Sequence, residues 1–101
     1  MSFVKLASVG DVKPNHMKGI KLNGKQILLA NLNGSFYAIG NVCTHMGCML
    51  SNGKIQGNNV ECSCHASVFD LTTGKVVSEP AYKPEPKYEL KIENDQVLIK
   101  L

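Results

Sequence analysis

The four cysteines of this 101-residue chain lie close together, between positions 43 and 64, and two of its three histidines lie among or beside them. Four cysteines in a short secreted chain would suggest two disulfide bonds. However, the segment Met1–Lys5 lacks the charged region, apolar core and cleavage site of a signal peptide. Because a disulfide framework tends to spread its cysteines along the chain and a metal site gathers them, the clustering favours a metal site.

The spacing of these residues defines two short candidate loops. Cys43 and His45 are two positions apart, so both side chains can point to the same side of an extended segment. Cys62 and His65 are three positions apart, a spacing that a tight turn can close around one metal. Sixteen residues separate the two motifs, and the pattern predicts a Cys₂His₂ ligand set between two facing loops. The third histidine, His16, is expected to be a surface turn residue.

Two kinds of metal centre compete for such a ligand set. Zinc takes two cysteines and two histidines in a tetrahedral site, but its usual patterns pair cysteine with cysteine and histidine with histidine along the chain. Here each loop supplies one of each, which suits a two-iron cluster in which one iron binds both cysteines and the other both histidines. Replacing two thiolates with neutral imidazoles makes such a site less negative, which raises its reduction potential.

Turn signals recur at short intervals and separate runs in which apolar and polar residues alternate. Three Asn-Gly pairs, at 23–24, 33–34 and 52–53, suit two-residue hairpin turns because both positions can take a positive φ. The clearest alternating run, Lys87–Glu93, is expected to form a hairpin with Gln96–Leu101. Further strands are predicted at 2–7, 19–22, 26–31, 35–39, 59–61, 68–70 and 75–77, and a single helical turn at 11–17. The pattern predicts an all-β fold, an antiparallel β-sandwich or small barrel that carries the Cys/His segment as loops.

The motif C-x-H, sixteen residues, C-x-x-H resembles the signature of Rieske iron–sulfur proteins, and the local sequences CTHMGC and CSCH are similar as well. The resemblance implies one Rieske domain over residues 1–101, with a small cluster-binding subdomain at about residues 40–80 on a β base. It also implies a [2Fe–2S] cluster in which Cys43 and Cys62 bind one iron and His45 and His65 bind the other. The segment Ser78–Ala81 resembles the proline-containing third loop that covers the cluster in this family.

The two remaining cysteines, Cys48 and Cys64, are not needed as ligands. In the branch that resembles the Rieske subunits of cytochrome bc and b6f complexes, the equivalent positions form a disulfide that ties the two loops together. Dioxygenase ferredoxins of the same fold usually lack this pair. The resemblance therefore implies a Cys48–Cys64 bridge, which would restrict the opening of the loops. A pair of buried thiols is the alternative, and a reducing cytoplasm would favour it.

Two positions after the last histidine bear on the potential, because hydrogen bonds to cluster sulfurs stabilise the reduced state. In high-potential relatives a serine two residues after that histidine donates to a bridging sulfide, and Ser67 occupies this place. A tyrosine two residues further donates to a ligand cysteine in those relatives, but here the residue is Phe69. One donor is kept and one is missing, so the resemblance implies an intermediate potential.

The net charge of +3 is mild, and the basic residues are scattered singly. Nucleic-acid binders show clustered basic patches with aromatic residues nearby, so no nucleic-acid partner is expected. No apolar run approaches the roughly 20 residues of a membrane span, so no span is expected. With no secretion signal, the expected location is cytoplasmic.

The leading functional prediction is a one-electron carrier of the ferredoxin type rather than an enzyme. Its partners would be redox proteins, a reductase or a terminal oxidoreductase. Three alternatives stay open: a soluble subunit or fragment of a larger oxidoreductase (a bc-type complex, an oxygenase or a nitrite reductase system), a redox sensor that uses the disulfide as a switch, and a zinc-binding structural module.

Overall fold

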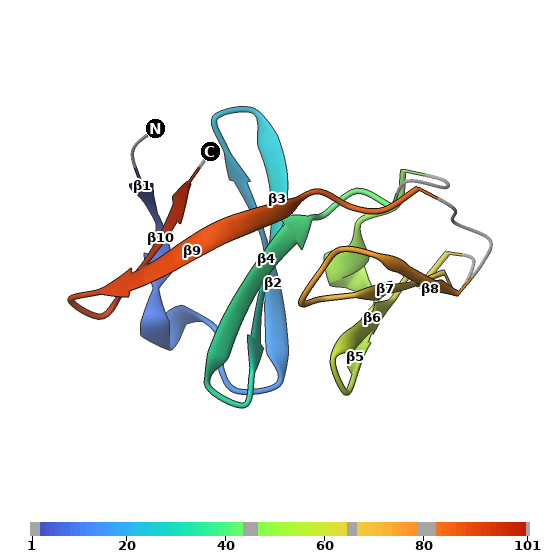
Figure 1. Cartoon of the computed structure of the whole chain (residues 1–101), viewed down its shortest axis with the longest axis horizontal. Helices are drawn as coiled ribbons and strands as arrows, with labels where there is room; N and C mark the ends of the chain where they lie inside the picture. The colour runs from blue at the N-terminus through green and yellow to red at the C-terminus, as the bar shows by residue number, and fades with distance from the viewer. Residues whose placement is uncertain (1–2, 44–46, 65–66, 79–82, 101) are drawn as a thin grey trace.

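A computed structural model describes residues 3–43, 47–64, 67–78 and 83–100 of the chain. These residues form two antiparallel sheets, which Figure 1 shows side by side along the long axis of the molecule. The larger sheet has six strands in the order β1-β10-β9-β4-β3-β2, and the smaller has four in the order β5-β6-β7-β8. The predicted all-β, antiparallel class is confirmed. None of the described helices is long and apolar enough to cross a membrane.

The strands are short and follow one another through tight turns. In chain order they are β1 (Phe3–Ser8), β2 (His16–Leu22), β3 (Lys25–Leu32), β4 (Ser35–Gly40), β5 (Lys54–Gln56), β6 (Asn59–Glu61), β7 (Val68–Asp70), β8 (Val76–Ser78), β9 (Lys87–Glu93) and β10 (Gln96–Lys100). Within the described ranges, two single-turn 3₁₀ helices interrupt them, η1 (Val9–Asp11) and η2 (Leu50–Asn52).

Three hairpins of the larger sheet depend on residues with a left-handed backbone. Asn23 (φ 51°) and Gly24 (φ 78°) join β2 to β3, and Asn33 with Gly34 joins β3 to β4 in the same way. Positive φ at both central positions is what a type I′ turn requires, and this turn matches the twist of the flanking strands. Asn94 (φ 51°) and Asp95 (φ 61°) form the equivalent turn between β9 and β10. The two Asn-Gly hairpin turns at 23–24 and 33–34 are thus confirmed.

The prediction of a hairpin turn at Asn52-Gly53 is wrong. Asn52 ends η2, and Gly53 has a negative φ of −86°. Gly53 is needed for a different reason, since a Cβ atom there would collide with the main-chain carbonyl of Glu61 across the β5–β6 pair. The hairpin turn lies instead at Gly57-Asn58, where Gly57 alone has a positive φ (62°), as type II′ geometry prefers.

The predicted single turn at 11–17 also differs from the structure. A 3₁₀ turn forms at Val9–Asp11, where the Ser8 amide donates to the Asp11 carboxylate at 3.0 Å. The downstream half of that segment extends into β2, which begins at His16. His16 is exposed as expected, but it lies at the start of a strand rather than in a turn.

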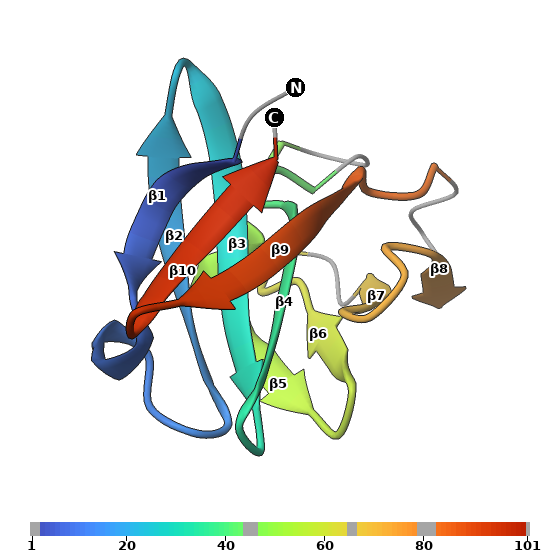
Figure 2. The same cartoon turned by 60° about the vertical axis from the view of Figure 1, so that its left-hand side comes forward.

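Strand β3 is the centre of the core because both of its faces are covered. Leu28, Ala30 and Leu32 pack with residues of the smaller sheet and its loops, in the cluster that also contains Phe69 and Val60. Leu29 faces the opposite side and packs with Val97 of β10 and with residues of the β1–η1 segment. Figure 2 shows β10 and β9 crossing in front of β3. A strand buried on both faces reads as a continuous apolar run rather than an alternating one.

Candidate metal centre

The first candidate loop leaves β4 and returns to η2 as a narrow hairpin. The Leu50 amide donates to the Asn41 carbonyl at 2.6 Å, and Val42 and Met49 form an antiparallel bridge. Closer to the tip, the amide of Cys43 donates to the carbonyl of Cys48 at 2.6 Å. These bonds hold Cys43 on the inner side of the loop, where only 2% of its surface is exposed.

The second candidate loop joins β6 to β7. Glu61 pairs with Val68 at the ends of the two strands, and the Cys62 amide donates to the Ser67 carbonyl at 2.8 Å. Cys62 is buried, with 2% exposed, whereas Cys64 is exposed. Phe69 lies in β7, the strand that follows the loop, where it pairs with Val60 across the sheet and is fully buried.

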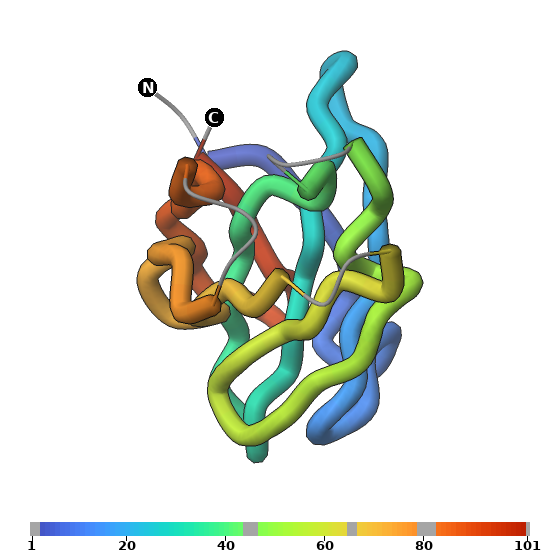
Figure 3. Tube along the Cα trace, turned by 90° about the vertical axis from the view of Figure 1, so that its right-hand side faces the viewer, coloured from blue at the N-terminus to red at the C-terminus, as the bar shows by residue number. Residues whose placement is uncertain are grey.

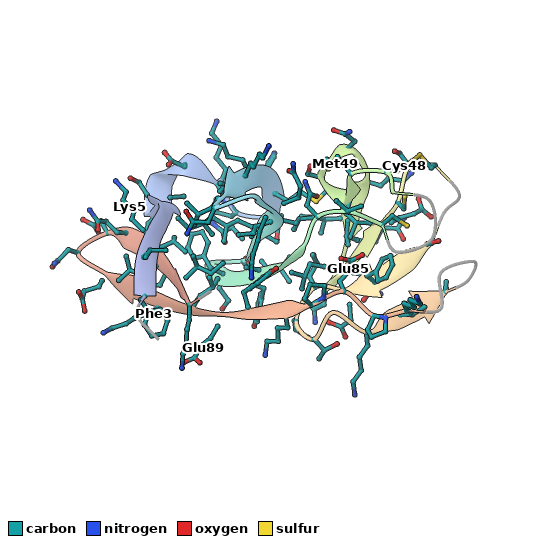
Figure 4. All side chains as sticks on the ribbon, turned by 90° about the horizontal axis from the view of Figure 1, so that it is seen from above. Phe3, Lys5, Cys48, Met49, Glu85 and Glu89 are labelled. Carbon is teal, nitrogen blue, oxygen red and sulfur yellow. A yellow bond between two sulfur atoms is a disulfide. The ribbon has the colours of Figure 1, made fainter. Side chains whose placement is uncertain are left out.

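A disulfide between Cys48 and Cys64 joins the two loops, with the Cα atoms 6.5 Å apart. The bridge confirms the predicted pairing. Figure 4 shows it at one end of the molecule, next to Met49, while Phe3 lies at the other end. The Sγ atom of Cys62 lies within 4.8 Å of both bridged sulfur atoms. The structure therefore brings three of the four cysteine sulfurs together where the two loops are joined.

Cys43 and Cys62 take no part in a disulfide. Both belong to the same buried cluster, together with Phe69, Leu50 and core residues of β3. Two buried thiols from two facing loops form a soft donor pair that suits iron in an iron–sulfur cluster. The other two predicted ligands, His45 and His65, lie outside the described residues. The arrangement of the thiols fits a [2Fe–2S] cluster, and the complete ligand set stays a prediction.

The predicted tuning position lies in a dry environment. The Ser67 side chain belongs to a residue with no exposed surface, and the main chain of Ser67 is bound to Cys62. A buried hydroxyl group depends on hydrogen-bond partners within the protein, because no water is present to replace a lost partner. This burial is consistent with a hydroxyl directed at the centre, but its role as a tuning group stays a prediction.

Sequence reasoning missed two buried polar residues beside the loops. Asn41 lies two positions before Cys43 and is 2% exposed, and Glu85 is 5% exposed. Glu85 precedes β9, and its Oε1 atom occupies space that a side chain at Gly40 would fill, at 2.5 Å from a Cβ atom there. No local pattern marks either residue, because the partners of both are distant in sequence.

A groove of about 430 Å³ runs past Glu85 between the first loop and β9. Tyr88 lines it, and the ammonium group of Lys25 lies 6.0 Å from the centre of the Tyr88 ring. Burial and the nearby charge of Glu85 both raise the pKa of Tyr88. Cys43 and Cys62 do not line this groove, so it is separate from the candidate centre.

Figure 3 looks onto the smaller sheet, with the larger sheet behind it. His16 contributes to neither loop. Its Nδ1 atom lies 3.0 Å from the Pro14 carbonyl oxygen, at an exposed position of β2. Glu61 is half-buried and lies 3.9 Å from the ammonium group of Lys54, whose side chain is exposed. Neither residue has a partner among the described residues that would indicate acid–base chemistry.

Comparison with known proteins identifies a family. The family model for the Rieske [2Fe-2S] domain matches residues 2–91. The ferredoxin component of the naphthalene 1,2-dioxygenase/salicylate 5-hydroxylase systems of Ralstonia sp. is 36% identical over 100 residues, which cover 99% of this chain and 96% of that protein. The Sphingomonas yanoikuyae B1 ferredoxin superimposes with a TM-score of 0.94 at 28% identity, covering 99% of both chains. A ferredoxin solved in complex with the oxygenase of carbazole 1,9a-dioxygenase gives 0.91 at 26% identity, with 98% of this chain and 96% of that chain covered.

Proposed function

The chain belongs to the Rieske [2Fe-2S] domain family, and from this premise we propose that it works as a ferredoxin-type carrier that passes one electron at a time. The observation that carries the proposal is the pair of buried thiols, Cys43 and Cys62, on two loops that a disulfide ties together. A site of this kind needs no substrate pocket, because an electron passes between a buried centre and a partner surface.

We propose Cys43 and Cys62 as ligands of one iron and His45 and His65 as ligands of the other. When bound in this way, a [2Fe–2S] cluster supplies a one-electron couple at a higher potential than an all-cysteine cluster. The two cysteines lie in the buried core cluster, which keeps water from their sulfur atoms. The support for the histidines is their spacing within the two motifs.

The described residues of the two loops are tied by hydrogen bonds and by a disulfide. The first loop is closed by the bond from the Cys43 amide to the Cys48 carbonyl and the second by the bond from the Cys62 amide to the Ser67 carbonyl, at 2.6 and 2.8 Å. The disulfide links them covalently. Because packing and hydrogen bonds around a site preserve its geometry, we expect the centre to change shape little when its charge changes.

We further propose that the partners are a reductase and a terminal oxygenase. The support is that the Ralstonia relative is the ferredoxin component of a dioxygenase system and that a similar ferredoxin has been solved in complex with an oxygenase. The chain covers nearly the whole length of both proteins, so each of them is matched as a whole and not through one domain of a larger protein. The cytoplasmic location stays a prediction, and cell fractionation tests it.

Potentiometric titration of the purified protein tests the carrier function. We expect one electron per chain, with a visible spectrum that bleaches reversibly, and rapid reoxidation by a Rieske oxygenase added in excess. Two electrons per chain, or a thiol–disulfide couple as the only redox event, would contradict the proposal and favour a redox sensor.

A further inference from the structure

The buried side chain of Asn41 connects the two arms of the first loop at its base. Its Oδ1 atom accepts a hydrogen bond from the Ser51 amide at 2.8 Å, and its Nδ2 atom donates to the Ser51 hydroxyl at 3.0 Å. Because a backbone amide can only donate, the contact with Ser51 settles which side-chain atom of Asn41 is the oxygen. The main-chain carbonyl of Asn41 accepts from Leu50 at 2.6 Å. One residue therefore holds three groups of the returning arm.

The same residue connects the loop to the larger sheet. The main-chain amide of Asn41 donates to the main-chain carbonyl of Gln26 on β3 at 3.0 Å. Its Nδ2 atom also lies 3.6 Å from the Met49 sulfur, within the limit for a weak hydrogen bond to a thioether. Asn41, Met49 and Ser51 form what we call the loop clamp. Cys43 lies two positions after Asn41 in the sequence.

Strand β2 leaves a space for the loop clamp at Gly19. A Cβ atom at this position would lie 2.6 Å from both the Nδ2 atom of Asn41 and the Oγ atom of Ser51. Real Cβ atoms do not approach other atoms so closely, so any side chain here would push the clamp away from the sheet. By contrast, a Cβ atom at Gly10 would have no neighbour within 4 Å. Gly19 lies on β2, which supplies no candidate ligand. A substitution at Gly19 would therefore displace the clamp without changing a ligand.

We propose that Asn41 is a positioning residue that sets where Cys43 lies relative to the second loop, and through it the reduction potential of the centre. The inference rests on the proposed ligand set. Cys43 continues the same hydrogen-bonded hairpin, through its 2.6 Å bond to the Cys48 carbonyl, so a displacement at the clamp is passed to the ligand. The potential responds because it depends on hydrogen bonding and solvent access around the sulfur atoms.

The test compares Asn41→Ala and Gly19→Ala with the control Gly10→Ala, each purified with its cluster. We expect both clamp variants to shift the midpoint potential in the same direction and to broaden the EPR lines of the reduced state, while the control matches the wild type. The clamp also holds the arm that leads to Cys48. A thiol reductant should therefore cleave the Cys48–Cys64 bridge roughly tenfold faster in both variants, as the loss of buried hydrogen bonds implies.

A role in stability alone has a different signature. If both loaded variants melt at lower temperature but keep the wild-type potential and EPR spectrum, Asn41 does not position the centre and the proposal is overturned. If Asn41→Ala does not accept a cluster, Gly19→Ala decides, because its Cβ atom would displace the side chains of Asn41 and Ser51 without adding a charge. A wild-type protein without any cluster would refute the proposed function instead, and the disulfide cleavage rates would still test the clamp.

Discussion

Cys48 and Cys64 form a covalent bridge between the two candidate ligand loops, with their Cα atoms 6.5 Å apart and the two residues 16 positions apart in the sequence. The buried Cys62 thiol lies within 4.8 Å of this bridge. The bridge therefore joins the loops directly beside a proposed ligand, at the point where the loops have little core of their own.

Removal of the bridge should cost substantial stability. In the chain-entropy account a bridge that closes a loop of about 15 residues contributes about 3 kcal/mol. We expect the double variant Cys48→Ser, Cys64→Ser to lose about this much free energy of unfolding, measured by urea denaturation of the cluster-loaded protein. A thiol reductant should destabilise the wild type by a similar amount and leave the double variant unaffected. Equal stability of the two proteins without reductant would contradict the prediction.

Substitution of Ser67 should lower the reduction potential. Ser67 is fully buried and its main chain is bound to Cys62, so water cannot substitute for a lost hydroxyl. A hydrogen bond to a charged acceptor is worth about 1.5–3 kcal/mol, and about 1.4 kcal/mol corresponds to about 59 mV for one electron. For Ser67→Ala, voltammetry should show a fall of some tens of millivolts, with about 130 mV as the upper bound. The exposed Ser63 in the same loop supplies the control, Ser63→Ala. An unchanged potential in Ser67→Ala would show that the hydroxyl does not reach the centre.

Introduction of a hydroxyl at Phe69 should raise the potential. Phe69 is fully buried in the same cluster as Cys43 and Cys62, so a Phe69→Tyr hydroxyl has to find a partner inside the protein. If it donates to a ligand sulfur, the potential rises and the melting temperature changes little. A hydroxyl without a partner would cost about 1–3 kcal/mol and leave the potential unchanged. That result, from voltammetry and thermal melting together, would be evidence against the prediction.

Acid sensitivity should depend on the turn after β7. The Thr72 hydroxyl donates to the Asp70 carboxylate at 2.6 Å and the Thr72 amide at 2.8 Å, and the hydroxyl is the main cause of the lowered pKa of Asp70. A lowered folded-state pKa gives stability that is present above the ordinary value of 3.8 and is lost as the pH falls through the folded value. Thr72→Val should therefore be less stable than the wild type at pH 6, with the difference shrinking towards pH 2. A pH-independent difference in urea denaturation would show that the hydroxyl acts by packing alone.

Much of the fold could be predicted because local residues determine it. Strands β6, β7 and β9 begin and end where the alternation predicts, and the Asn-Gly pairs at 23–24 and 33–34 form the expected turns. Strand β5 was missed because Lys54–Gln56 holds one apolar residue, Ile55, which is too few for an alternating pattern. Its existence depends on pairing with β6, which is a tertiary property.

The site was only partly predictable for a related reason. The spacing of the cysteines and histidines was enough to predict two loops, and the resemblance of the extra pair Cys48 and Cys64 to the bc-type branch predicted the bridge between them. The loop clamp was not, because Asn41 looks like an ordinary loop residue until Ser51 and β2 are packed against it. Buried polar residues acquire their roles from distant partners, which a single sequence does not display.

The measurement that tests the central claim most directly is pulsed EPR on the reduced protein, together with iron and acid-labile sulfide counts. We expect two irons and two sulfides per chain and nitrogen couplings from two imidazole ligands. His45→Cys and His65→Cys should remove one coupling each, whereas the control His16→Ala should keep both. A colourless, zinc-loaded protein from iron-sufficient cells, or a cluster without nitrogen couplings, would contradict the account.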